Sequence, residues 1–318
     1  MQNIKLKYWA IAFAALITSS VSSPAQTTSA PAVPVAEAVR RAAAQRAVYL
    51  EEFKNLISKE NKTFEIFDKK GQIKKRRTVT SVFIVYQPVK SKEVVEFRNV
   101  IAVDGKAVAD ADKRAEDLFT QLVDPESSEK ELQKLQNESL RFDEGIYIDG
   151  LTLFQAVALA DNLQPSFDFS LAGTDVIDGR DVVVLAYEQK RSSPFITTDT
   201  SAKPVEGKLT LEYDVDISGE VNPRLKGKLW LDAETMQVRR ETRQLTVRPE
   251  GFASPIVFTE DEFQYVQTDF PLLAPKRIVH LQNRIGKKDA VAQTTEKVVF
   301  EYEKFTRPDV EVKSAEVK

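Results

Sequence analysis

The chain has 318 residues and a formal net charge of −3, with no cysteine and one histidine. Without cysteine it can form no disulfide, thiolate metal site or iron–sulfur cluster, and one histidine is too few for the usual zinc or copper sites. The acidic balance argues against general nucleic-acid binding, which needs a basic surface. A chain of this length can still bury a core without disulfides.

The first 25 residues have the features of a secretory signal peptide. Lys5 and Lys7 form a basic start, an apolar run occupies residues 8–17, and Ser23 and Ala25 fit a signal-peptidase site. The run has about half the length that a membrane-spanning helix needs, so a cleaved signal is favoured over a membrane anchor. We therefore expect a periplasmic or secreted protein, cleaved near Ala25, with no membrane-spanning segment in the mature chain.

A flexible linker and an amphipathic helix are expected next. Residues 26–36 are mostly small residues and prolines, which is typical of a linker. From about Glu37, apolar residues recur at intervals of three and four, which predicts a helix with one apolar stripe. The stripe consists of Val39, Ala43, Ala47, Leu50, Phe53 and Ile57.

From Thr63 the apolar period changes to two, which indicates strands. The first strands are expected at residues 63–68, 77–86 and 95–103. Turns are expected around Gly71 and at Asp104-Gly105. Helices are then expected at residues 112–123, from a capping box at Ser128 and Glu131, and at residues 151–163. These helices form an insertion at about residues 108–163.

Strand signals dominate the second half of the chain. Apolar and polar residues alternate at residues 167–171, 182–187, 209–217, 228–231, 238–247, 256–267, 277–285 and 298–305. Such alternation predicts an antiparallel sheet with one apolar and one solvated face. With the helices gathered in the first half, the fold class is α+β.

Few residues could carry out catalysis. His280 occupies an alternating strand position, and no Gly-x-Ser-x-Gly turn is present, so a structural role is favoured over a catalytic triad. Glycine-rich phosphate loops are absent as well, and no cofactor is expected. The carboxylates Asp214 and Asp216, and the run at residues 260–262, could form a glycosidase pair or a calcium site. Solvated surface acids are the favoured interpretation, so we expect no enzyme, with a carboxylate-only hydrolase as the remaining alternative.

Six basic residues surround the first hairpin turn. They are Lys69, Lys70, Lys74, Lys75, Arg76 and Arg77. They could attract an anionic membrane or an acidic partner. The favoured interpretation is that they protect an edge strand from aggregation.

Two local segments resemble a known superfamily. Residues 227–240 (GKLWLDAETMQVRR) and the hairpin at residues 178–185 (DGRDVVVL) are similar to elements of the LolA-like superfamily, which includes periplasmic lipoprotein carriers and RseB-type sensor domains. Residues 97–106 and 302–305 also resemble a family of exported acidobacterial proteins.

The resemblance implies one domain over residues 37–318, built on a single large curved antiparallel sheet. This half-open barrel would have the N-terminal helix and the inserted helices on its concave face. The carriers have no catalytic residues, and an apolar cavity of this kind holds acyl chains by burial, at ~0.8 kcal/mol per methylene. The residues expected to line it are Leu209, Leu211, Tyr213, Trp230, Phe263, Tyr265, Phe300 and Tyr302, with Phe154 and Val157 on the covering helix.

Two functions follow from the resemblance. The first is non-covalent binding of a lipid or lipoprotein acyl group. The second is a regulatory or scaffold module that binds a peptide or an envelope protein partner, through exposed sheet edges and the basic hairpin.

Overall fold

The computed structural model describes residues 33–88, 94–123, 129–146, 148, 150–198, 205, 207–215, 222–248, 254–285 and 292–307. The chain divides into two units, Met1–Val33 and Pro34–Lys318, and we describe the second. The expected signal peptide and most of the expected linker lie outside the described residues. Within those residues, no helix is long and apolar enough to span a membrane.

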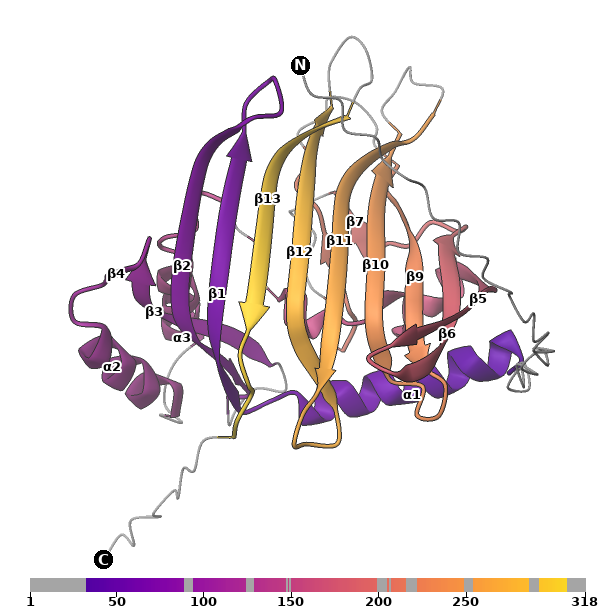
Figure 1. Cartoon of the computed structure of the whole chain (residues 1–318), viewed down its shortest axis with the longest axis horizontal. Coiled ribbons are helices and arrows are strands. Elements are labelled where there is room, and N and C mark those ends of the chain that lie inside the picture. The colour runs from indigo at the N-terminus through magenta and orange to yellow at the C-terminus, as the bar shows by residue number, and fades with distance from the viewer. Residues whose placement is uncertain are drawn as a thin grey trace, which may run out of the picture. The chain divides into compact units, whose positions relative to one another are not determined.

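Eleven strands form one antiparallel sheet in the order β4-β3-β2-β1-β13-β12-β11-β10-β9-β6-β5 (Figure 1). The strands are β1 (Leu56–Phe67), β2 (Ile73–Tyr86), β3 (Val95–Val103), β4 (Lys106–Ala107), β5 (Phe167–Ile177), β6 (Arg180–Gln189), β9 (Arg224–Asp232), β10 (Val238–Val247), β11 (Ile256–Gln267), β12 (Leu273–Ile285) and β13 (Ala292–Tyr302). The sheet is curved and does not close into a barrel. The α+β class with one large antiparallel sheet is confirmed.

The pairing of β1 with β13 joins the two ends of the sequence at the middle of the sheet. Glu60 lies opposite Tyr302, and Phe64 lies opposite Val298. Strands β1 to β4 thus form one half of the sheet, and the strands from β12 to β5 form the other half.

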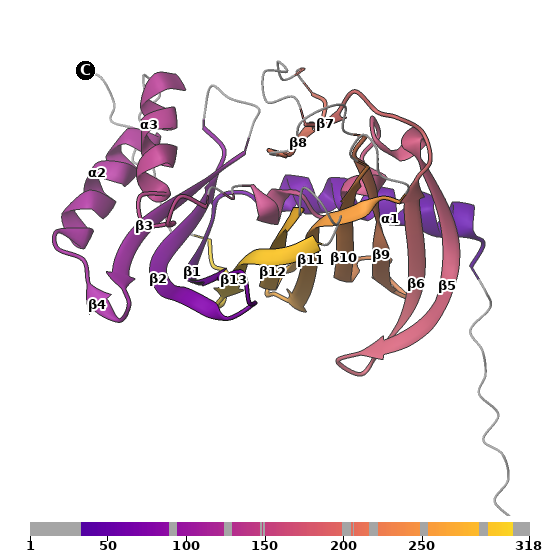
Figure 2. The ribbon, with the colours of Figure 1, turned by 90° about the horizontal axis from the view of Figure 1, so that it is seen from above.

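One face of the sheet is covered, and we call it the covered face. Helix α1 (Val35–Glu52) and a small parallel pair, β7 (Ile196–Thr197) and β8 (Leu211–Glu212), lie on this side (Figure 2). Helices α2 (Ala111–Val123) and α3 (Glu129–Ser139) pack against β3, beside the edge of the sheet. The opposite face is the open face, although at β2 and β3 it is packed against Leu118 of α2 and Leu132 and Leu135 of α3.

Helix α1 forms where it was expected, but its buried side is rotated from the predicted stripe. The helix buries Ala38, Val39, Ala42, Arg46 and Tyr49. The buried side differs from the predicted stripe because it includes Arg46 and Tyr49. The apolar parts of these two side chains pack in the core, and their polar ends form hydrogen bonds.

Two predicted elements are wrong. The helix expected at residues 151–163 is instead a series of short 3₁₀ turns, and Ala156 has the left-handed angles φ 46° and ψ 49°, which interrupt any helix. The long strand expected at residues 209–217 is reduced to the two residues of β8, which pairs with β7 and not with the main sheet. Residues 216 and 217 and the Ser128 cap lie outside the described residues.

Gly227 in β9 lies at a point on the covered face where there is no space for a side chain. A Cβ atom at this position would lie 2.0 Å from the Thr242 carbonyl oxygen and 2.5 Å from the Tyr187 hydroxyl. We expect Gly227→Ala to lower the free energy of unfolding by about 1–3 kcal/mol through overpacking. Urea denaturation measures the change, and Lys228→Ala on the exposed neighbour should stay within about 0.5 kcal/mol. Equal stability of both variants would contradict this account of the packing.

Candidate functional site

The covered face carries buried charged side chains where a uniformly apolar surface was expected. Their exposed fractions range from 0 to 8%. They are Glu60 and Lys62 on β1, Glu96 and Arg98 on β3, Glu241 and Arg243 on β10, Asp261 on β11 and His280 on β12. Buried charges are tolerated only when they are paired and hydrogen-bonded, so their partners determine what lies over the sheet.

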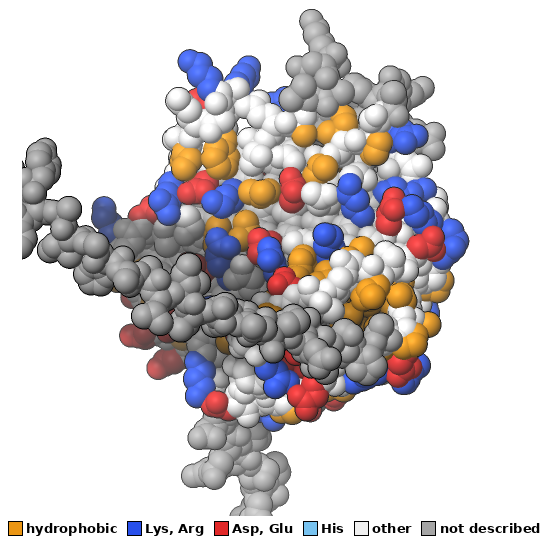
Figure 3. Space-filling model, turned by 45° about the vertical axis from the view of Figure 1, so that its right-hand side comes forward, with side chains coloured by type: hydrophobic (Ala, Val, Ile, Leu, Met, Phe, Trp, Pro, Cys, Tyr) orange, Lys and Arg blue, Asp and Glu red, His pale blue; other side chains and the backbone are white. Residues whose placement is uncertain are grey.

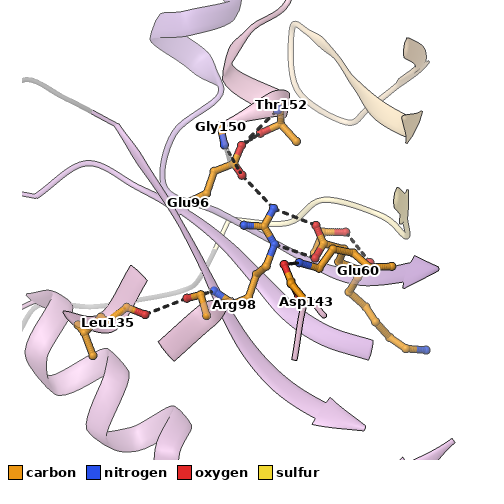
Figure 4. A network of polar contacts seen from close by, with 11 residues as sticks. Glu60, Glu96, Arg98, Leu135, Asp143, Gly150 and Thr152 are labelled. Atoms are coloured by element: carbon orange, nitrogen blue, oxygen red, sulfur yellow. Dashed lines mark hydrogen bonds and ion pairs between the residues drawn. The ribbon is translucent and has the colours of Figure 1, made fainter. Parts of the chain in front are cut away.

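Arg98 connects two carboxylates. Its Nε donates to Glu60 Oε1 at 2.8 Å, and its Nη2 donates to Glu60 Oε2 at 3.2 Å and to Glu96 Oε2 at 2.9 Å (Figure 4). The guanidinium also lies over the Phe83 ring, 4.8 Å from its centroid. Such charge-assisted, two-pronged bonds fix the position of both carboxylates.

Lys62 and Asp143 form a second buried ion pair. Burial lowers the pKa of Lys62 and raises the pKa of Asp143, because removal from water disfavours both charges. The Lys62 ammonium lies 5.5 Å from the Phe64 ring centroid and 5.7 Å from that of Phe300. The pair fastens the chain that follows α3 to the middle of β1.

Residues 150–166, which we call the strap, cross the covered face. Acidic side chains of the sheet accept hydrogen bonds from the strap's backbone. Glu96 accepts from the Gly150 and Thr152 amides at 3.3 and 3.2 Å, and Glu241 accepts from the Ala156 amide at 2.7 Å. These bonds replace the helical bonds that the strap's amides lack.

Basic and phenolic side chains satisfy the strap's carbonyl groups. Arg243 donates to Phe154 O at 2.6 Å, and Arg46 donates to Gln155 O at 3.0 Å. The Tyr49 hydroxyl donates to Thr152 O at 2.7 Å. The strap therefore has one fixed path between α1 and the sheet.

A groove of about 970 Å³ lies between α1, the strap and the chain that leads into β8. Its apolar lining consists of Ala43, Ala47, Leu50, Val94, Leu153, Phe154, Leu159, Ala160 and Leu209. Asn162 holds Leu209 in place, since its amide donates to Leu209 O at 3.0 Å and accepts from Leu209 N at 3.2 Å. Charged residues at the groove include Lys54, Asp161, Lys208 and Glu212.

A second groove, of about 710 Å³, lies mainly on the open face. Its lining contains more charged side chains, among them Glu188, Lys226, Lys228, Glu260 and Glu262. The groove beside α1 exposes the larger apolar area of the two, although a greater share of its exposed lining is polar.

The structure separates the residues that were expected to line one cavity. Phe154 and Leu209 line the groove beside α1. Buried in the core are Val157, Leu211, Phe263, Tyr265, Phe300 and Tyr302. Tyr213 is half-buried. Trp230 alternates with the buried Leu229 and Leu231, and Arg240 stacks on its ring at 4.8 Å. That any of these residues contacts a ligand stays a prediction.

Sequence reasoning missed the contribution of α1 to the groove. Ala43, Ala47 and Leu50 were assigned to the core stripe, whereas they line the groove. The signal was present in the small side chains of Ala43 and Ala47, one turn apart, which leave space beside a helix.

The carboxylates singled out in the sequence do not converge. Glu260 bonds to Gln244, and Glu262 pairs with Arg240, whereas the intervening Asp261 pairs with His280 on the opposite face. Asp214 is exposed, and Asp216 lies outside the described residues. In the part of the chain that the structure covers, no group of three or more His, Cys, Asp or Glu residues could hold a metal ion.

The basic hairpin is partly neutralised. Lys75 and Arg77 both pair with Glu144, and Arg76 lies 3.7 Å from Glu65. Lys69, Lys70 and Lys74 are exposed. These pairs place part of the cluster against the chain that follows α3.

No family model matches the chain, and no curated protein matches it. Similar solved structures include a DUF1329 family protein from Desulfovibrio piger, with a TM-score of 0.30, 13% identity and coverage of 88% of this chain and 95% of that one. A putative outer membrane lipoprotein-sorting protein domain from Vibrio parahaemolyticus has a TM-score of 0.33 and 10% identity, with coverage of 85% of this chain and 93% of that one. A LolA superfamily protein from Nitrosomonas europaea has a TM-score of 0.30 and 12% identity, with coverage of 88% of this chain and 96% of that one. At these TM-scores and identities, the likeness decides neither the family nor the function of this chain.

Arg98 should be the most sensitive position of the network. We expect Arg98→Met to lower the free energy of unfolding by about 3–5 kcal/mol, because Glu60 and Glu96 stay buried without their cation. Arg141→Met, which removes an exposed pair with Glu138, should cost less than about 1 kcal/mol. Urea denaturation compares the two, and similar small losses would show that the buried network contributes little.

His280 should titrate above the ordinary histidine range. Burial alone would lower its pKa, but the Asp261 carboxylate, 2.6 Å from Nδ1, and the nearby Glu296 raise it. The contribution to stability is therefore complete below the unfolded pKa of about 6.5 and is lost as pH rises through the folded pKa. NMR titration of this only histidine measures the shift, and Asp261→Asn should lower the pKa. A pKa at or below 6.5 in the unmodified protein would contradict the pairing.

Proposed function

We propose that this protein binds a lipid or lipoprotein acyl chain non-covalently in the groove between α1 and the strap, outside the cytoplasm after its signal peptide is removed. The observation that carries the proposal is the row of apolar side chains along an open groove of about 970 Å³. Ligand pockets in proteins have volumes of roughly 300–1,000 Å³, so a chain of this class fits.

Two rigid walls favour binding of a flexible chain in the groove. On one side, α1 presents the small side chains of Ala43 and Ala47, which leave space beside the helix backbone. On the other side, the strap presents Leu153, Phe154 and Leu159, and its backbone is held by buried charges. A preformed groove avoids the ordering of protein side chains on binding, so more of the ~0.8 kcal/mol per buried methylene contributes to affinity.

The charges at the groove suit a ligand with one polar end. Lys208 is exposed beside Leu209, and among the described residues it makes no ion pair. Lys54 pairs with Glu51 at 2.6 Å. A carboxylate or phosphate could stay solvated near Lys208 while the acyl chain lies along Leu209 and Phe154.

Native mass spectrometry of the exported protein, before and after delipidation and with added palmitate, tests the proposal. We expect a one-to-one palmitate adduct that Ala47→Trp weakens by about tenfold or more, because the indole fills space that several methylenes would occupy.

The matched control is Val48→Trp. Val48 is the next residue of α1, about 100° around the helix from Ala47, and is 42% exposed. This variant should bind palmitate like the unmodified protein. Absence of any lipid adduct, or equal binding by both tryptophan variants, would contradict the proposed groove.

A further inference from the structure

The two edges of the sheet differ in whether other parts of the chain cover them. The edge at β3 is covered. β4 pairs with its end, and Arg114 donates to Val100 O at 3.1 Å. The Asn99 side-chain amide donates to Ala111 O at 3.1 Å, and the Arg98 backbone N–H donates to Ser139 Oγ at 2.9 Å. Helices α2 and α3 therefore occupy the space where another strand would pair.

The opposite edge, β5, pairs only with β6 among the described residues. Alternate backbone N–H and C=O groups of an edge strand point away from its neighbour, so about every second residue of the eleven in β5 presents these groups on the side away from β6. Natural edges are protected by charged side chains, above all lysine, by proline, by a β-bulge or by a covering element, and of these β5 has a register shift between Leu171 and Gly173. Residues 167–177 contain no lysine, arginine or proline.

Apolar side chains are exposed on the same strand. Leu171 is 46% exposed and Val176 is 60% exposed, and Phe169 is half-buried beside the Tyr187 ring. The side of the molecule that carries β5 and β6 shows hydrophobic side chains interspersed with charged ones (Figure 3). A docked strand would add cross-strand contacts with these side chains to its backbone hydrogen bonds.

The charges along the edge determine which occupant fits. β5 carries Asp168 and Asp175, and Asp178 follows in the hairpin turn, all exposed. Asp175 accepts from Trp230 Nε1 at 3.2 Å, and Asp168 lies 3.7 Å from Arg191. A second copy of β5 would bring aspartates near aspartates, which is unfavourable between neighbouring strands. A strand with basic residues would meet opposite charges.

We propose that β5 binds an extended segment of a partner protein by strand addition, and that this segment alternates apolar and basic residues. Strand addition is a general mode of peptide recognition in which backbone bonds give affinity and alternate side chains give specificity. The site lies on the sheet edge and is independent of the acyl groove. On β6, Asp181 adds an exposed acidic group behind the edge, whereas Glu188 pairs with Lys190 at 2.6 Å.

Hydrogen exchange with mass spectrometry on the whole protein tests the proposal. The probe is an acetylated peptide of alternating lysine and valine, about ten residues long, which is the length of a strand that could span β5. Its counterpart alternates glutamate and valine. We expect the lysine peptide to slow exchange in residues 167–177 by roughly tenfold and the glutamate peptide to have no effect.

The matched variants change β5 and a distant exposed position in the same way. Leu171→Lys together with Val176→Lys should abolish the protection, because they add repulsive charge to the edge. Ile73→Lys on β2, where the side chain is 51% exposed, should leave it unchanged. Neither position of the double variant is buried, so both proteins are expected to fold, and their thermal unfolding checks this.

Three outcomes overturn the proposal. The first is that the lysine peptide gives no protection at β5. The second is that both peptides protect equally, which removes the charge preference. The third is that β5 is already protected without peptide: if this protection depends on protein concentration, the occupant is a second copy, and if it does not, the chain covers its own edge.

Discussion

The pairing of Arg98 with Glu60 and Glu96 is the constraint on which the arrangement over the sheet depends. A guanidinium taken out of water between two carboxylates is stable only if every charge keeps its hydrogen bonds. Glu96 completes its set with the backbone and hydroxyl of Thr152 and the amide of Gly150. The ion network therefore specifies where the strap begins, and a displaced strap would remove three hydrogen bonds from the buried Glu96 carboxylate.

A second set of charges, on β10, holds the strap further along the sheet. Arg243 lies over the Phe263 ring at 4.8 Å, bonds Glu241 at 2.9 Å and still donates to the strap. The Tyr187 hydroxyl donates to the same carboxylate at 3.1 Å. Because residues 150–156 of the strap are held by groups on rigid strands, the outer side chains of this part can serve as a wall of the groove.

The strands were predictable because a solvated face imposes strict alternation, as in β10 and β11. The strap was not, because residues 151–163 are apolar around most of a helix circumference and have no period that separates a helix from a covered irregular segment. The buried charges were also hidden. From the sequence, Lys62 would be expected in solvent, because its partner Asp143 lies 81 residues away. Trp230 stands between Leu229 and Leu231, so hydrophobicity alone could not assign it to a face. The pleat of the strand places it on the face opposite to these two buried leucines.

The seam between β1 and β13 has a consequence for the order of assembly. The Ser58 hydroxyl donates to the Glu303 carbonyl across 245 residues of chain, and in the part of the chain that the structure describes β13 connects the two halves of the sheet. Until the last strand inserts, β1 and β12 each have an open edge. Contacts of such long range form slowly, and unpaired edges promote aggregation during that interval. A truncation that removes β13 would therefore divide the sheet at its centre, and would not merely shorten it.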